Sequence, residues 1–158
     1  MSTALKGWHP GELAIQRKLN FATAMTEAWT GIDGAMPEQH SRFYCTRLPF
    51  IPITTLDARG RPWGSLLAGA RGLPGFVRSP SSTVLEIDAC VWDGDPWTEN
   101  VEASMSGAAG VGAKFLVAGI GVDFSTRRRN KFAGCARTLR RLSEHDWAIM
   151  LEVNQAIG

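Results

Sequence analysis

A run of basic residues in the second half of the chain is the first candidate for chemistry. It reads T-R-R-R-N-K from Thr126 to Lys131. In an extended strand, side chains two residues apart share a face, so we expect Arg127, Arg129 and Lys131 to align. Guanidinium groups bind phosphate oxygens through paired hydrogen bonds, so this face predicts an anion site. The alternative is a solvated edge strand, where basic residues discourage pairing with another sheet.

The stretch from Arg61 to Gly69 is the second candidate binding element. In a strand, Trp63, Ser65 and Leu67 would share one face, and the residues between them the other. A hydroxyl group between a Trp and a Leu can meet a phosphate or a ribityl group, and small residues opposite would let a planar ring approach the backbone. The alternative is a packed strand in which the serine has no role.

Other catalytic arrangements find no support in the sequence. The histidines His9, His40 and His145 are isolated, so we expect no metal site. No G-x-S-x-G elbow and no G-x-G-x-x-G phosphate loop occurs. The catalytic residues are therefore left unknown.

Length and composition indicate one ordinary globular domain. The chain has 158 residues, 44% hydrophobic and 20% charged, and its net charge of +2 is too small to imply a nucleic-acid partner. Three cysteines without a C-x-x-C pair fit a reducing compartment. We expect no signal peptide, no membrane span and a cytoplasmic location.

Helical patterns come first along the chain. Apolar residues at helical spacing, among them Ile15, Leu19 and Trp29, predict a helix over residues 10–31. A shorter helix is expected to start at Pro37 and to run to about Arg47.

Strand patterns fill the remainder. A β-hairpin is expected from residues 50–56 and 63–68, with Gly60 in its turn at positive φ, and a loop over residues 69–82. Further strands are expected over 83–91, 115–124 and 147–153, and a basic strand or turn over 126–139, while 97–112 resists assignment. In the strand over 115–124, Leu116, Ala118, Ile120, Val122 and Phe124 share one face.

Two helices followed by about six short strands favour an antiparallel barrel over a Rossmann fold. We therefore predict a mainly β protein with N-terminal helices and a six-stranded antiparallel split β-barrel of Greek-key type. We expect residues 1–158 to form a single domain, with a helical segment over 1–47 and the barrel over 48–158.

Five motifs in order resemble the pyridoxamine 5′-phosphate oxidase-like family. The hairpin D-A-R-G-R-P-W-G-S-L-L-A-G from Asp57 is similar to the first hairpin of that family. H-P-G-E from His9, G-L-P-G-F from Gly72, D-P-W-T-E-N from Asp95 and V-D-F-S-T-R-R-R from Val122 resemble elements of one of its branches. The resemblance spans nearly the whole chain.

The resemblance implies an FMN-binding split barrel that works as a homodimer, with FMN at the subunit interface. The expected activity is a flavin-dependent oxidoreductase acting on a small-molecule substrate, without a nucleic-acid or membrane partner. The cofactor-binding residues that it implies come from the two candidate elements. They are Arg61, Trp63, Ser65, Leu66, Leu67, Arg127, Arg128, Arg129 and Lys131.

Two departures from the family pattern keep alternatives open. Lys131 stands where the branch has a second Arg, and Ala133 stands where it has an Asn. The alternative function is a non-catalytic split-barrel module that carries or senses flavin, or that has lost flavin binding. A deazaflavin or a haem are the alternative cofactors.

Overall fold

The computed structural model describes residues 8–28, 31–107 and 114–158, which form four helices and seven strands. The helices are α1 (Pro10–Lys18), α2 (Ala22–Ala28), α3 (Glu38–Arg47) and α4 (Pro96–Met105). The strands are β1 (Phe50–Leu56), β2 (Pro62–Ala68), β3 (Val77–Ser81), β4 (Val84–Cys90), β5 (Leu116–Asp123), β6 (Arg128–Arg141) and β7 (Asp146–Ile157). None of the described helices is long and apolar enough to span a membrane.

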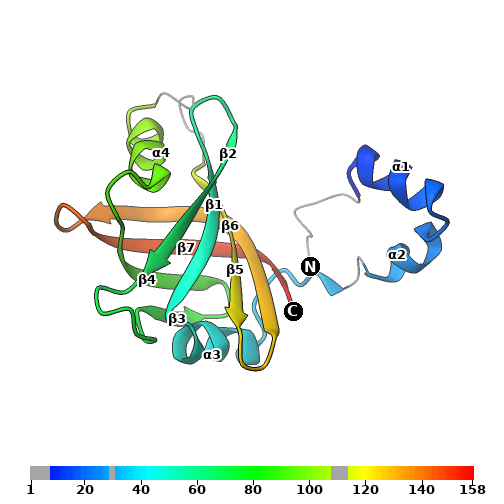
Figure 1. The fold of residues 1–158 in the computed structure, drawn as a ribbon, viewed down its shortest axis with the longest axis horizontal. Coiled ribbons are helices and arrows are strands. Elements are labelled where there is room, and N and C mark those ends of the chain that lie inside the picture. Colours follow the sequence, from blue (N-terminus) through cyan, green and yellow to red (C-terminus); the bar gives the residue numbers. More distant parts are fainter. Residues whose placement is uncertain (1–7, 29–30, 108–113) are drawn as a thin grey trace.

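Six of the strands close into an antiparallel barrel. The strand order is β2-β1-β5-β6-β7-β4-β3, and a pairing of β2 with β4 at Ala68 and Cys90 joins the two sides of the barrel. Strand β3 adds to the free edge of β4 as a seventh strand. The predicted mainly β fold with a six-stranded barrel is confirmed (Figure 1).

The first hairpin follows the prediction closely. β1 and β2 pair in register from Phe50 with Ala68 to Leu56 with Pro62, and Gly60 has a φ of 75° in the turn. The loop predicted over residues 69–82 is wrong in its second half. There the chain forms β3, because β4 offers a free edge whose hydrogen bonds it satisfies.

The long first helix is divided in the structure. α1 ends at Lys18, and Asn20 turns the chain with a φ of 56° before α2 begins. The expected apolar face is not covered, since Ile15 and Leu19 are exposed, and α1 and α2 lie to one side of the barrel in Figure 1. The predicted end of this helix falls partly at residues 29 and 30, outside the described residues.

Two of the helices cover the open ends of the barrel. α4 lies at its upper end in Figure 1 and α3 at its lower end. Each helix inserts a fully buried aromatic side chain, Trp97 from α4 and Tyr44 from α3. The ring of Trp97 meets Phe115 edge-on at 5.5 Å, and Tyr44 meets Phe132 at the same distance. Helix α4 lies where the sequence pattern gave no assignment, and Asp95 caps it by accepting a hydrogen bond from the Trp97 backbone N–H at 2.8 Å.

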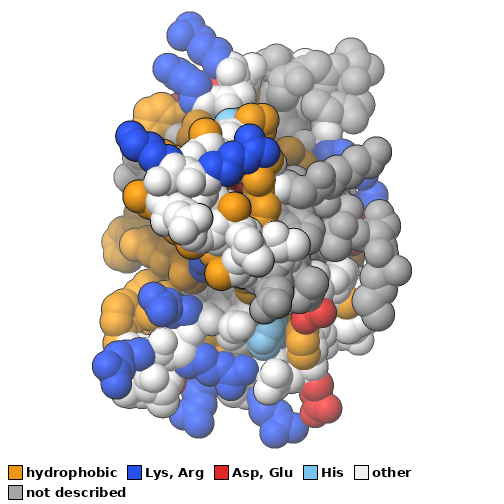
Figure 2. All heavy atoms as spheres, turned by 90° about the vertical axis from the view of Figure 1, so that its right-hand side faces the viewer, with side chains coloured by type: hydrophobic (Ala, Val, Ile, Leu, Met, Phe, Trp, Pro, Cys, Tyr) orange, Lys and Arg blue, Asp and Glu red, His pale blue; other side chains and the backbone are white. Residues whose placement is uncertain are grey.

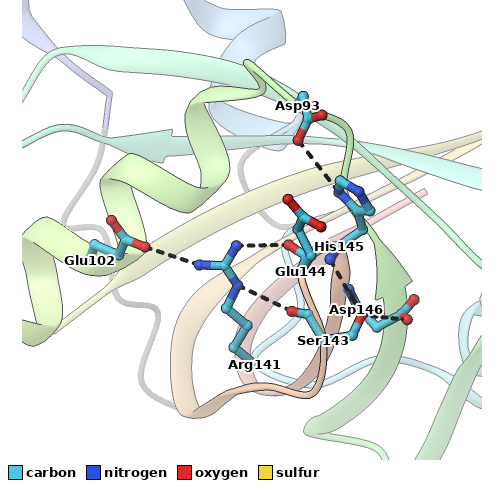
Figure 3. A network of polar contacts seen from close by, with 7 residues as sticks. All are labelled: Asp93, Glu102, Arg141, Ser143, Glu144, His145 and Asp146. Atoms are coloured by element: carbon cyan, nitrogen blue, oxygen red, sulfur yellow. Dashed lines mark hydrogen bonds and ion pairs between the residues drawn. The ribbon is translucent and has the colours of Figure 1, made fainter.

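A polar network ties α4 to the turn between β6 and β7 (Figure 3). Arg141 is its centre, with an ion pair to Glu102 of α4 at 3.3 Å and hydrogen bonds to the backbone oxygens of Ser143 and Glu144. The same arginine lies over the ring of Trp147, 5.7 Å from its centre. Helix α4 is therefore held to the barrel both by its buried apolar side chains and by the ion pair of Glu102 with Arg141.

Strand β6 begins and ends two residues later than predicted, and β7 is longer than predicted; both bend around the barrel. Their register shifts between Ala133 and Gly134 and again between Ala136 and Thr138. Such shifts are β-bulges, which increase the local twist of a strand. At the first bulge, a Cβ on Gly134 would collide with the backbone oxygen of Glu152 and lie 3.0 Å from the Val153 Cα. Only glycine fits there without moving β7.

Replacing Gly134 by Ala should lower the free energy of unfolding by about 1–3 kcal/mol, because one of the paired strands must shift. Urea denaturation measures this loss. The control is Gly64→Ala on β2, where no atom lies within 4 Å of the added Cβ and the change should be small. Equal effects of the two variants would contradict the close packing at the bulge.

Candidate functional site

A row of small and polar side chains crosses the outer face of the barrel. In register across five strands it reads Gly64, Thr54, Ala118, Ala133 and Gln155. These positions face outward because their neighbours Ile53, Val117 and Phe132 are buried in the core. The short side chains leave the backbone open to a flat ligand.

Four members of this row, Thr54, Ala118, Ala133 and Gln155, form the floor of an open groove of about 440 Å³. Ile120 and Ile157 lie beside it as the strand neighbours of Lys131, and Ile32 lines the groove from the segment that leads to α3. Lys131 is the one charged residue among the described lining residues. The groove is thus apolar, with a single cation and the amide of Gln155.

The predicted basic face is correct for two of its three residues. Arg129 and Lys131 lie two apart on β6 and point outward, but Arg127 lies in the preceding turn with a φ of 60°. The prediction is wrong for Arg127 because the turn between β5 and β6 occupies that position. The side chains of Arg127, Arg129 and Lys131 form no hydrogen bond or ion pair with any described residue. Two unpaired cations therefore lie on the outer face of β6.

Arg128 is directed to the other side of the sheet. Its Nη2 donates a hydrogen bond to the backbone oxygen of Gln39 at 3.2 Å, and its guanidinium group lies 5.1 Å from the ring centre of Phe43. Both contacts come from α3. The arginine triplet is therefore divided between two separate surfaces.

The predicted cofactor-binding residues of β2 also point to two different sides of the sheet. Trp63, Ser65 and Leu67 share a face as predicted, but that face points into the barrel, with Ser65 6% exposed and Leu67 fully buried. Leu66 is 50% exposed and faces outward, as Gly64 does. Of the predicted β2 residues, Leu66 therefore lies on the same side as the groove, and Ser65 and Leu67 do not.

Arg61 and Trp63 form a clamp at the hairpin turn. Asp57 accepts hydrogen bonds from the Arg61 Nε at 2.7 Å and from the Trp63 indole at 3.1 Å, as well as from two backbone N–H groups. The backbone N–H of Arg61 contributes most to holding the pKa of Asp57 well below its usual range, and the two side-chain donors add to it. The register across the sheet places Trp63 level with Gly134 of β6, through Thr55 and Val117. Gly134 is five residues from Arg129 along β6, or about 17 Å at the spacing of a strand.

Sequence reasoning missed Thr54, Ala118 and Gln155. A usable signal existed for Ala118, because the sequence pattern places it with Leu116 and Ile120 on one apolar face of β5. That face is the outer one, with Leu116 50% exposed and Val117 buried behind it. An apolar outer face is typical of a surface that binds a ligand or another chain.

Replacing Asp57 by Asn should destabilise the fold near pH 7, because the amide nitrogen cannot accept from Arg61 and Trp63. A carboxyl group whose pKa is lowered by folding stabilises the folded state fully at pH values above its pKa in the unfolded chain, about 3.9. This contribution to the free energy of unfolding is lost as the pH falls toward the pKa in the folded state. Urea denaturation at about pH 7 and about pH 3 should therefore show a difference between wild type and variant that narrows in acid. Glu144→Gln, whose carboxylate has no described partner, is the control. A loss that does not change with pH would contradict the role of the Asp57 charge.

Comparison with known proteins finds solved structures of similar fold but no similar sequence. No family model and no curated protein matches the sequence. A variant of HupZ from Group A Streptococcus is similar in structure with a TM-score of 0.51 and 12% identity, over 77% of this chain and 98% of that one. An F420 reductase matches with a TM-score of 0.50, 12% identity and the same coverage. A flavin reductase domain protein from Arthrobacter sp. FB24 shows 9% identity and a TM-score of 0.43, over 73% of this chain and 80% of that one.

The first two of these likenesses cover almost the whole of the neighbouring chains. At 12% identity they concern the arrangement of strands rather than the residues of a site. Together with the closed order of the strands, they agree with the fold that the sequence motifs imply. The chain has a split-barrel fold.

Proposed function

We propose that this chain binds FMN in the outer groove and acts as a flavin-dependent oxidoreductase on a small molecule. The observation that carries the proposal is the row of small side chains with two unpaired cations beside it. One of the structural neighbours is named as an F420 reductase, which supports a flavin-type cofactor.

The residues of the groove fit the two ends of such a cofactor. Ala118, Ala133 and Thr54 offer a flat floor against which a planar ring can lie. Lys131 lies at one side of the floor and Arg129 two residues further along β6, where a phosphate group would find both charges. Gln155, across from Ala133, adds an amide that can donate to ring oxygens or accept from ring N–H groups.

The chain's own residues would bind and orient the cofactor rather than move protons. When bound, a flavin supplies a ring that accepts a hydride, so the protein is left with positioning it and excluding water. Among the described lining residues of the groove there is no histidine and no carboxylate. This agrees with a site whose chemistry resides in the cofactor.

A second copy of the chain is the partner that the outer face suits. Leu56, Leu66 and Leu116 lie on outward positions of three adjacent strands, β1, β2 and β5, and are 38%, 50% and 50% exposed. The groove is open on this side, so a partner subunit would both bury these leucines and cover a bound ring. We assign the homodimer to the cytoplasm, where the free cysteines Cys45, Cys90 and Cys135 would remain reduced.

The second candidate function is a split-barrel module that carries flavin, or none, without catalysis. It is favoured by one observation, that Lys131 and Ala133, the two departures from the family pattern, both line the groove. Lysine lacks the planar fork of arginine, and alanine removes a polar group from the floor. A deazaflavin such as F420 is the alternative cofactor for the same floor.

The two cations should determine FMN affinity. Arg129→Ala and Lys131→Ala should each weaken binding by about 1.5–3 kcal/mol, the usual contribution of a charged hydrogen bond. An absorbance titration of the purified protein with FMN measures the dissociation constants. Arg140→Ala, at the far end of β6, removes the same charge as a control and should leave the affinity unchanged.

A substitution in the floor of the groove tests FMN binding independently, in the same absorbance titration. Ala118→Leu should abolish FMN uptake while circular dichroism shows the barrel intact, because the larger side chain fills the space of the ring. Saturable uptake by wild type that is followed by turnover with NAD(P)H supports the oxidoreductase, and uptake without turnover supports the carrier. No uptake of FMN or of F420 would contradict the cofactor assignment.

The apolar outer face should control the oligomeric state. Leu66→Asp combined with Leu116→Asp should convert a dimer into monomers, because two charges would be buried without partners. Analytical ultracentrifugation at micromolar concentration measures this. Leu73→Asp, at an exposed leucine in the loop after β2, is the control that should remain dimeric. A monomeric wild type would contradict the interface.

A further inference from the structure

A second cavity lies at the lower end of the barrel, apart from the outer groove. It has a volume of about 730 Å³ and lies between one face of α3 and the turn that joins β5 to β6. Arg42 and Arg47 line it from α3, and Arg128 lines it from the start of β6. Figure 2 shows Lys and Arg side chains gathering at this end of the molecule.

The cavity and the outer groove are on opposite faces of the same strands. Along β6, Arg128 lines the cavity and Lys131 lines the groove, three residues or about 10 Å apart. The side chain of Arg128 lies toward α3, and that of Lys131 points outward. A ligand in one site therefore does not occupy the other.

The acidic residues of the cavity leave its arginines largely free. Asp123 is the direct strand neighbour of Arg128, yet its carboxylate accepts hydrogen bonds from the backbone N–H and the hydroxyl group of Ser125, at 2.9 and 2.6 Å. Glu38 pairs with Arg42 at 3.2 Å, but both side chains are well exposed, and such surface pairs contribute little. Arg47 has no partner among the described residues.

Arg128 is already oriented for a ligand. Its bond to the Gln39 backbone oxygen uses one of its five N–H donors, and the ring of Phe43 supports the guanidinium plane from one side. A planar cation held in this way loses little side-chain entropy when it binds an anion. The remaining donors match the oxygens of a phosphate group.

From these contacts we propose that the α3 cavity binds a phosphate-bearing small molecule of nucleotide size, with Arg128 and Arg47 holding its phosphates. The volume lies in the range of sites for drug-sized and cofactor-sized ligands and exceeds what a single inorganic ion fills. Arg42 can leave its exposed pair with Glu38 and join the other two arginines. The site is independent of the proposed flavin site.

His40 provides a reporter beside the cavity. Its ring is 6% exposed, and burial together with the nearby charge of Arg128 lowers its pKa, while Asp33 acts in the opposite direction. A phosphate bound at Arg128 would offset the positive charge. The pKa of His40 should therefore rise when the cavity is occupied.

The test uses the full chain without FMN and two probes, inorganic pyrophosphate and ADP. Isothermal titration at low ionic strength should show one saturable site for each, with ADP at least as tight. Arg47→Gln and Arg128→Gln should each weaken ADP binding about tenfold or more, as expected for the loss of a charged hydrogen bond. Arg140→Gln removes the same charge far from the cavity and should change the affinity less than about twofold, allowing for screening.

The proposal would be overturned if neither probe showed saturable binding. It would also be overturned if Arg128→Gln and Arg140→Gln weakened ADP binding equally. A third contradicting result is loss of ADP binding in Lys131→Gln but not in Arg128→Gln. The last result would move the site to the outer groove. NMR titration of His40 gives a check on folded protein, since a pKa that does not move with saturating ADP also contradicts the site. Retention of ADP binding by protein saturated with FMN would separate this site from the proposed flavin site.

Discussion

Closure of the hydrogen-bonded barrel is the constraint on which the other features of this protein depend. Once β2 meets β4 at Ala68 and Cys90, the barrel strands have neighbours on both sides, and each side chain must face either the core or the outside. The inner positions are then taken by large apolar groups and by the rings that α3 and α4 insert at the two ends. Any ligand site must therefore lie on the outer face or at the ends of the barrel.

Side chains fill the interior of the barrel closely. A Cβ added at Gly119 would collide with the ring of Phe132 from β6. A Cβ added at Gly121 would collide with Leu48 and with the rings of Phe43 and Tyr44, so Gly121 allows the close approach of α3 to β5. Ser65 is enclosed in the same interior and has no hydrogen-bond partner within the described part of the chain. Its hydroxyl group is thus unavailable to a cofactor on the outer face, although its position in the sequence suggests that role.

The strand β6 distributes positive charge to two surfaces. Successive residues alternate in direction, so Arg129 and Lys131 face outward, with Lys131 lining the groove, while Arg128 turns to α3. Neighbouring acidic groups do not neutralise these cations, since Asp123 is used by the turn and Glu38 by an exposed pair. Cations that are left unpaired by their own chain are available to anionic ligands, which is the common basis of the two proposed sites, the flavin site in the groove and the phosphate site in the α3 cavity.

The sequence by itself determined the local elements and their order. The hairpin with its turn at Gly60, the helix after Pro37 and the alternating strands follow from periodicity and turn chemistry, which act over a few residues, and the ordered motifs added the split-barrel fold. What only the tertiary structure decided is which side of each strand is the outside. Alternation alone does not distinguish a face that packs in the core from one that awaits a partner, so Leu116 and Ala118 of β5 give the same pattern as a core strand. Strand β3 and the division of the arginine triplet likewise depend on contacts with β4 and α3, which are distant in the sequence and become neighbours only when the barrel closes.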